Sequence, residues 1–411
     1  MKKKLACLVG ASLACGSTGA LAAGEGITLS GFLTAGATYA DQKVLPPAST
    51  TSTGSRAVSQ DGNIENRVGF TNDSRIGIQL SAKVNREVSI TGQLLARGSD
   101  ENFNMKADWA FVTYRAADQL SIRGGKLKLT TFLVSDYIEV GYAYPWIRPP
   151  QEVYYANPIT TITGVDALAR LNFGDYSLLF QPYFGNSRGE QALVPQEAVT
   201  GQPVCLTPPS AGPSPAYTTC PAGTIMYVDF TADSLTGVNL SFGSDLFTVR
   251  AGYLQTLVSA PSFGVSEDQA TFSSVGATVD WKGLVFYSEY FQREIEGRAN
   301  GAFPNQKGGY ATIGYRFGKF LPHLTYATLD DNDNPINPGV TGLPLKQTSA
   351  TLGLRYELGT GAALKIEAQQ VKPEVVYTGQ PGRGLLIYDP NLGPEASESV
   401  MIYSLAVDVV F

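Results

Sequence analysis

The segment Arg75–Val84 reads RIGIQLSAKV, and its apolar and polar residues alternate one by one. Successive side chains of a β-strand point to opposite faces, so Ile76 and Ile78 would lie on one face and Arg75 and Gln79 on the other. An amphipathic helix needs apolar residues three or four positions apart, and strict alternation does not supply that spacing. The segment therefore predicts a strand with one apolar and one polar face.

The same alternation recurs along the chain in segments of about ten residues, the length that a tilted strand needs to cross the hydrocarbon core of a bilayer. A soluble β-sandwich also alternates, so the number of strands carries more weight than any one of them. Sixteen candidate strands begin near residues 26, 74, 86, 105, 119, 166, 176, 237, 246, 270, 284, 308, 320, 347, 362 and 398.

The connections between these candidates alternate in length. Short ones, such as Gly174–Asp175 and Gly359–Gly361, carry turn-forming residues. Short turns at one end and long loops at the other are typical of bacterial outer-membrane barrels with an even number of strands. The sequence thus predicts one all-β domain, an antiparallel up-and-down transmembrane β-barrel of sixteen strands. The long connections fall near 41–73, 99–104, 133–165, 188–224, 261–269, 297–307, 330–345 and 373–397.

Composition excludes several other classes of protein. The 411 residues include 44 Gly and 24 Pro, which disfavours a helical bundle. The 21 Tyr and 19 Phe are too many aromatic side chains for a disordered chain. Charged residues make up only 16% and acidic residues outnumber basic ones, so no nucleic-acid partner is expected.

The N-terminus has the pattern of a Sec signal peptide. Lys2–Lys4 precede an uncharged stretch, and Ala20–Ala22 supplies the small residues that signal peptidase recognises. Glycines and hydroxyl residues dilute the stretch, which disfavours a membrane-spanning anchor, and the residues before Cys15 do not suit a lipoprotein site. We expect residues 1–22 to be removed after export, leaving a mature domain 23–411 with 27 basic residues, 36 acidic residues and a net charge of −9.

Only Cys205 and Cys220 remain after this removal, in a segment rich in Pro, Ser, Thr and Gly. Exported proteins meet an oxidising compartment, so we expect these two residues to form a disulfide. The alternatives are two free thiols or a metal site, but a chain whose single histidine is His323 offers few ligands for a metal. No metal and no cofactor is therefore expected.

The last candidate strand has the sharpest local pattern. Met401, Tyr403 and Leu405 share one face, and the chain ends in the aromatic residue Phe411. This arrangement resembles the C-terminal signal of outer-membrane β-barrels, which the barrel-assembly machinery recognises, and the resemblance assigns that role to Phe411. In a soluble protein such an apolar edge strand would invite aggregation.

Three motifs resemble those of Gram-negative porins, the sixteen-stranded trimeric channels of the outer membrane. They are Asn72 with Ser74–Gly77, Asp108–Val112 and Gly125–Leu127. The resemblance implies a homotrimer among outer-membrane lipids and lipopolysaccharide, and a water-filled channel for passive diffusion of small hydrophilic solutes and ions. It also implies a third loop folded into the pore, although Leu133–Val165 lacks the Pro-Glu-Phe-Gly-Gly run of the enteric members.

The polar faces of the second, third and fifth strands predict a basic wall inside the barrel. A change of apolar parity after Gly125 is interpreted as a β-bulge that keeps two further lysines inward. The predicted pore-lining residues are Arg75, Lys83, Arg97, Arg123, Lys126 and Lys128.

The third loop carries the opposing charges. Asp136, Glu139 and Glu152 would face the basic wall, with Arg148 as the exception. Rows of opposite charge across a narrow waist set up a transverse field that favours polar solutes. Arg250, Arg316 and Arg355 extend the basic wall farther round the barrel, so we expect a mild preference for anions despite the net charge of −9. The alternative is that individual basic residues only solvate the wall or form ion pairs within it.

Other functions remain as alternatives. The channel could be substrate-selective, with the loop tyrosines forming a stacking track, although packing of the loop is the simpler role for these rings. An outer-membrane hydrolase would need a histidine beside a serine, and His323 has no neighbouring Ser or Asp in the sequence. A non-conducting adhesin or structural barrel is the third alternative. We expect no enzymatic activity.

Overall fold

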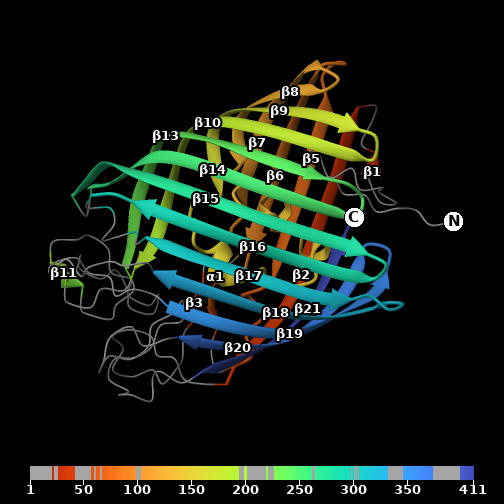
Figure 1. Ribbon diagram of the computed structural model, residues 1–411, viewed down its shortest axis with the longest axis vertical. Helices are drawn as coiled ribbons and strands as arrows, with labels where there is room; N and C mark the ends of the chain where they lie inside the picture. Colours follow the sequence, from red (N-terminus) through yellow and green to blue (C-terminus); the bar gives the residue numbers. More distant parts are fainter. Residues whose placement is uncertain are drawn as a thin grey trace.

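The computed structural model describes residues 21–22, 26–41, 57–59, 62–64, 67–98, 103–193, 199–200, 219–220, 226–261, 264–297, 299, 303, 305–331, 346–373 and 399–411. Strands dominate this part of the chain, as Figure 1 shows. Sixteen of them form a barrel: β2 (Ile27–Ala40), β5 (Arg75–Lys83), β6 (Val88–Arg97), β7 (Lys106–Ala117), β8 (Leu120–Lys128), β9 (Thr161–Phe173), β10 (Tyr176–Leu193), β13 (Met226–Gly243), β14 (Phe247–Ala260), β15 (Val265–Trp281), β16 (Leu284–Ile295), β17 (Gln306–Tyr315), β18 (Phe320–Asp331), β19 (Lys346–Gly359), β20 (Ala362–Pro373) and β21 (Val400–Val410).

Each barrel strand pairs antiparallel with its neighbours in the sequence, and the first and last strands close the barrel. Phe32–Ala40 of β2 lie opposite Ile402–Val410 of β21, while the other edge of β2 pairs with β5. The predicted antiparallel barrel of sixteen strands is confirmed. Shorter strands pair β1 (Leu21–Ala22) with β2, β3 (Ala57–Ser59) with β4 (Gly62–Ile64), and β11 (Val199–Thr200) with β12 (Thr219–Cys220).

The two faces of the wall differ as the alternation predicts. Along β19, Leu352 and Leu358 are exposed on the outer face, whereas Thr351 and Arg355 are buried on the inner face. An apolar outer surface suits the hydrocarbon of a bilayer, and a polar inner surface suits an aqueous lumen.

The two ends of the barrel differ in the length of their connections. At one end the strands meet in short turns, where Gly174 (φ +61°) and Gly318 (φ +60°) take the left-handed conformation that favours glycine. At the other end the connections are long. β11, which belongs to one of these connections, lies at the left of Figure 1, whereas the C-terminus lies toward the right.

Several strands begin earlier than the alternation predicts. β9 begins at Thr161 rather than near residue 166, β13 at Met226 rather than near 237, and β15 at Val265 rather than near 270. All three extensions lie at the end with long connections. Strands that continue past the bilayer no longer have one face in lipid, so their side chains need not alternate strictly.

The connection between β8 and β9 folds back inside the barrel. Residues 129–160 form this segment, called the inner loop below, rather than the predicted 133–165; it contains the short helices η2 (Ser135–Tyr137), η3 (Gly141–Ala143) and α1 (Gln151–Tyr154). No helix within the described ranges is long and apolar enough to cross a membrane. The inner loop and inward-facing residues of β13–β18 form the main hydrophobic core, and α1 contacts β16, β17 and β18. The inner loop therefore lies against one side of the wall.

The outer face predicts where the barrel does not tolerate a charge. Leu352 lies in the middle of β19 and is 64% exposed. Leu352→Arg should destabilise the folded barrel in lipid vesicles by about 2–4 kcal/mol, the typical cost of an arginine near the bilayer midplane. Urea titrations of folding into vesicles measure this loss, with Leu352→Met as the matched control. Equal stability of the two variants would contradict the assignment of this face to lipid.

Candidate functional site

Charged side chains of the wall hold the backbone of the inner loop. Lys365 of β20 donates to the carbonyl oxygen of Gly141 at 2.5 Å. Arg355 of β19 donates to the carbonyl oxygens of Tyr142 (2.6 Å) and Tyr144 (2.9 Å). Peptide groups that enter a barrel lose bulk water and need such partners.

Two wall carboxylates accept hydrogen bonds from N–H groups of the loop. Glu289 of β16 accepts from the backbone N–H of Leu133 at 2.6 Å, and Glu367 of β20 accepts from that of Ile147 at 2.8 Å. Glu289 also accepts from the hydroxyl group of Tyr154 at 2.6 Å. Donors and acceptors of the wall thus fix the path of the loop together.

The aromatic residues of the inner loop pack against the wall. Trp146 is buried, with ring centroids 4.9 Å from Tyr287 and 5.5 Å from Tyr310. Its indole N–H donates to the hydroxyl oxygens of Thr312 and Thr325, both at 3.0 Å. In this arrangement the Trp146 ring is a packing element and offers no open stacking face to a solute.

Glu139 of the inner loop gathers three basic side chains of the wall. Arg97 donates to it through Nε at 3.2 Å and also through Nη2, while Lys128 Nζ lies 3.8 Å and Arg75 Nη1 4.0 Å from its carboxylate. Burial alone would raise the pKa of Glu139, but the charges of Arg97, Lys128 and Arg75 outweigh it and hold this pKa well below its ordinary range. At this point the loop touches the basic wall.

A second ion pair lies within the wall itself. Arg123 of β8 donates to both carboxylate oxygens of Asp166 of β9, through Nε at 2.8 Å and through Nη2. The Arg123 guanidinium carbon also lies 5.2 Å from the centroid of the Phe111 ring. Asp166 and Phe111 therefore fix the direction of the Arg123 side chain.

Lys126 is placed on the outer face rather than in the lumen, which corrects the expectation for this residue. β8 pairs without interruption with β9 from Leu120 to Lys128, so the expected β-bulge is not found in this strand. Lys126 lies in register with Ala110 and Thr163, which are both exposed. The change of apolar parity arises because Leu127 faces inward and is buried in the core with the inner loop.

The other two lysines of the predicted wall lie at different levels. Lys128 is buried, and its Nζ lies 3.1 Å from Asp108 as well as near Glu139. Lys83 is exposed at the short-turn end of β5. Lys128 therefore belongs to the cluster at the loop, and Lys83 to one mouth of the barrel.

Arg148 and Glu152 of the inner loop are both buried. Arg148 donates through Nη1 to the two carboxylate oxygens of Asp73 (2.7 and 2.6 Å) and through Nη2 to Ser404 Oγ (2.7 Å). Glu152 accepts from Gln347 Nε2 at 2.7 Å, and burial raises the pKa of Glu152. The expectation that Glu152 opposes the basic wall is not met, because its carboxylate packs against β19 with 0% exposure.

The ion pairs of β6 and β8 turn their cations toward the lumen. The Arg97 side chain is 27% exposed and that of its partner Glu139 is 10% exposed. The Arg123 side chain is 18% exposed and that of Asp166 only 2%. On this side of the barrel, water therefore meets guanidinium groups whose carboxylate partners lie behind them.

Two ion pairs farther round the barrel have the opposite polarity. Asp136 of the inner loop is 26% exposed beside a buried Arg250, 3.2 Å away. Glu357 of β19 is 34% exposed beside Arg355, which is 9% exposed, 2.7 Å away. In both of these pairs the carboxylate is thus the more exposed member. β19, which carries Glu357, lies across the barrel from β8 in the strand order.

Sequence reasoning does not single out the wall residues that hold the loop. Lys365 and Glu367 lie on the polar face of a predicted strand, which is the only signal they carry. Glu289 and Asp73 carry no signal beyond their charge. Their partners are peptide groups of a loop whose path is set by the assembled barrel, so alternation cannot reveal these contacts.

Phe411 lies where the barrel closes. Its backbone N–H donates to the carbonyl oxygen of Gly31 at 3.0 Å, and its carbonyl oxygen accepts from the Gly31 N–H at 2.8 Å. The Phe411 ring also occupies the space that a side chain at Gly31 would need. The terminal residue is thus part of the last strand pairing.

The remaining predicted residues take no part in this site. Cys205 lies outside the described residues, and Cys220 pairs with Val199 in β12. His323 is buried, with Nε2 3.8 Å from Glu367. The described ranges contain no group of His, Cys, Asp and Glu arranged to hold a metal ion.

Comparison with known families identifies the chain. A profile of the Gram-negative porin family matches residues 8–374. The chain belongs to the Gram-negative porin family. The resemblance of its motifs is thereby confirmed, and the closed barrel is an outer-membrane channel. No curated protein matches the sequence.

Solved porin-like structures share the fold at low sequence identity. A loop L8 deletion mutant of OmpT, an outer-membrane protein of Vibrio cholerae, is 11% identical with a TM-score of 0.54, over 94% of this chain and 99% of that chain. OmpF of Salmonella typhi in complex with daunomycin is 12% identical with a TM-score of 0.51, over 94% and 97%. The outer-membrane channel DcaP of Acinetobacter baumannii is 10% identical with a TM-score of 0.50, over 94% and 97%.

The cluster at Glu139 predicts a stabilisation that acid removes. The pKa of Glu139 is lowered in the folded protein, so its contribution is complete above about pH 4.3, where an unfolded glutamate titrates, and is lost as the pH falls further. Glu139→Gln removes the carboxylate that Arg97, Lys128 and Arg75 share and should cost about 3–5 kcal/mol at pH 7. Urea unfolding in detergent at pH 7 and pH 3 measures this, and the deficit should shrink at pH 3.

Glu152→Gln is the matched control in the same loop. The pKa of Glu152 is raised by burial, so the carboxyl group costs more stability as the pH rises, and an uncharged amide of the same shape should remove that cost. We expect Glu152→Gln to be at least as stable as the wild type at pH 7. If Glu139→Gln were as stable as Glu152→Gln, the cluster at Glu139 would not have the stabilising role that we assign to it.

Proposed function

We propose that this porin is a water-filled channel for passive diffusion of small hydrophilic solutes and ions, without enzymatic activity. The lumen selects solutes through a transverse electric field at the level of the inner loop. Guanidinium groups of β6 and β8 form one side of this field, and carboxylates of the inner loop and β19 form the other. Such a field interacts favourably with the charges and dipoles of ions and polar solutes, whereas it does not stabilise an apolar solute.

The polarity of the ion pairs is the observation that supports this proposal. If Arg97 and Arg123 were paired with equally exposed carboxylates, the water beside them would meet little net field. Instead their partners are shielded, with Asp166 at 2% exposure. The carboxylates of Asp136 and Glu357 are the more exposed members of their own pairs. Each pair is thus a dipole: the cation is the more exposed member in the pairs of Arg97 and Arg123, and the carboxylate is the more exposed member in the pairs of Asp136 and Glu357.

A mild preference for anions follows from the distribution of basic residues. The exposed inward cations on β6–β8 are joined by Lys83 at one mouth, whereas the exposed carboxylates come from Asp136 and Glu357. Much of the net negative charge lies in turns and long connections, away from the waist. Charges near the narrowest part weigh most on a passing ion, because their distance from it is shortest.

Reversal potentials in a KCl gradient across a planar bilayer test this selectivity. A unit charge about 8 Å from an ion in water contributes about 0.5 kcal/mol, a factor of about two in partitioning. Arg97→Gln should therefore lower the chloride-to-potassium permeability ratio about twofold, and Asp136→Asn should raise it by a similar factor.

Two further variants separate a local field from overall charge. Lys282→Gln removes a positive charge at a turn, where Lys282 lies 4.9 Å from the Trp281 ring, and should leave the reversal potential unchanged. Arg123→Gln combined with Asp166→Asn keeps the net charge and removes one dipole, and should shift selectivity toward cations. Clear cation selectivity of the wild type would overturn the proposal, as would an equal effect of Lys282→Gln and Arg97→Gln.

The assembly and processing that we propose follow the family. We propose a homotrimer in contact with outer-membrane lipids and lipopolysaccharide, secreted with removal of residues 1–22 and inserted by the barrel-assembly machinery through a signal that ends at Phe411. The position of Phe411 at the strand closure supports this last role. Native mass spectrometry in detergent tests both points, because it gives the mass of the mature chain and its copy number.

A further inference from the structure

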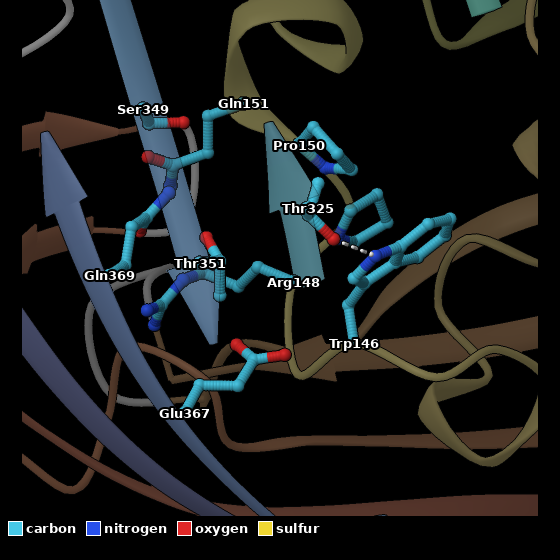
Figure 2. Close-up of a pocket in the computed structure, with 10 residues that line it drawn as sticks. Trp146, Arg148, Pro150, Gln151, Thr325, Ser349, Thr351, Glu367 and Gln369 are labelled. Carbon is cyan, nitrogen blue, oxygen red and sulfur yellow. Dashed lines mark hydrogen bonds between the residues drawn. The ribbon is translucent and has the colours of Figure 1, made fainter. Parts of the chain in front are cut away.

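A small cleft lies between the inner loop and the wall formed by β18, β19 and β20, as Figure 2 shows. Pro149, Pro150 and Gln151 line its loop side. Thr351 of β19 and Gln369 of β20 are among the residues on its wall side. The enclosed space, about 10 Å³, holds one group of the size of a water molecule.

The two prolines make the loop side of the cleft stiff. Proline has a fixed φ and no backbone N–H, so Pro149 and Pro150 cannot donate backbone hydrogen bonds to the wall. The carbonyl oxygen of Pro150 accepts from the N–H groups of Val153 and Tyr154, both at 3.1 Å, and thereby starts helix α1. The fixed φ angles and the start of α1 together limit the conformations that this turn can adopt.

The charged residues of the lining are already neutralised. The Arg148 guanidinium, which lies beside Thr351 in Figure 2, donates to Asp73 at 2.6 Å and to Ser404 at 2.7 Å. Glu367 accepts from the Ile147 N–H at 2.8 Å. A charged ligand would therefore meet no uncompensated opposite charge, and its loss of hydration would not be repaid.

Uncharged polar groups in the same lining have hydrogen-bonding capacity to spare. Thr351 is 7% exposed and Gln369 is 9% exposed, and neither side chain has a hydrogen-bond partner among the described residues. Gln151 uses one N–H on the Tyr155 hydroxyl at 3.0 Å, which leaves its carbonyl oxygen available. The polar atoms of these side chains are not among the fully buried atoms of the described residues that lack a partner, so they are open to the cleft, where the hydroxyl group of a solute can replace the water that they bind.

We propose that this cleft is a subsite for an uncharged, hydroxyl-rich solute, namely a polyol or the hydroxymethyl end of a sugar. The inference rests on the proposed channel function and names a class of solute for it. A hydroxyl group both donates and accepts, which matches the Thr351 hydroxyl and the amides of Gln369 and Gln151. The space takes a single hydroxyl group and excludes a sugar ring, so a solute binds by a terminal hydroxyl while the rest remains in the lumen.

Open-channel current noise in planar bilayers tests this subsite, with sorbitol as the probe. Wild-type channels should show excess noise that rises with sorbitol concentration and saturates. Thr351→Val and Gln369→Leu each remove one side chain's neutral hydrogen bonds and should weaken the apparent binding about fivefold. Thr113→Val is the matched control, because Thr113 faces Arg123 in the barrel far from the cleft and the same isosteric change there should leave binding unaltered.

Glucarate, an acyclic relative of sorbitol with a carboxylate at each end and no hydroxymethyl group, is the second probe. Thr351→Val should leave any glucarate-dependent noise unchanged. Conducting channels without saturable sorbitol noise would overturn the subsite and leave the channel function standing. Equal weakening of sorbitol binding by Thr113→Val and Thr351→Val would also overturn it. Purified protein that gives no conductance would overturn the channel function and this inference together. Unchanged KCl conductance and heat-modifiable migration confirm that each variant is folded.

Discussion

A loop inside a barrel must find a hydrogen-bond partner for every peptide group that it withdraws from bulk water. In this porin the partners are long charged side chains of the wall. Lys365 illustrates the constraint, because its ammonium group lies 2.9 Å from Asp408 and donates to the carbonyl oxygens of Gly141 and Trp146. A charge of this kind is stable in the interior only when it is both paired and hydrogen-bonded. The inner loop supplies the second condition, so loop and wall stabilise each other.

The same constraint explains the electrostatics of the lumen. Charges that hold the loop are buried and neutralised in place, as Arg148 is by Asp73 and as Glu139 is by Arg97. The water of the lumen contacts the more exposed member of each ion pair. The field therefore arises from oriented dipoles, and it persists although few charges of the interior are unpaired. An uncharged solute can use the remaining neutral groups beside the Pro149–Pro150 turn without disturbing this arrangement.

The barrel was accessible from the sequence because membrane strands obey a simple rule. Ile76 and Arg75 differ in environment for the same reason that neighbouring residues of every strand do, so alternation, turn spacing and Phe411 suffice for the architecture. The rule fails where the inner loop covers the wall. Leu127 is apolar and yet faces inward, where it packs against the inner loop. In the sequence this looks like a change of register, and the prediction for Lys126 is wrong for that reason. The prediction for Glu152 used only its charge, because the sequence does not show that its side chain is buried. Glu152 and its partner Gln347 are 195 positions apart in the sequence, and only the folded barrel brings them together.

The central claim is that the inner loop, held by the wall, narrows an aqueous lumen that the barrel alone would leave wide. Polymer exclusion tests it most directly: the single-channel conductance is measured in the presence of neutral polyethylene glycols of graded size. The account predicts that conductance recovers its polymer-free value at a polymer size well below the diameter of an empty sixteen-stranded barrel. Recovery only for polymers as wide as the empty barrel would contradict the account.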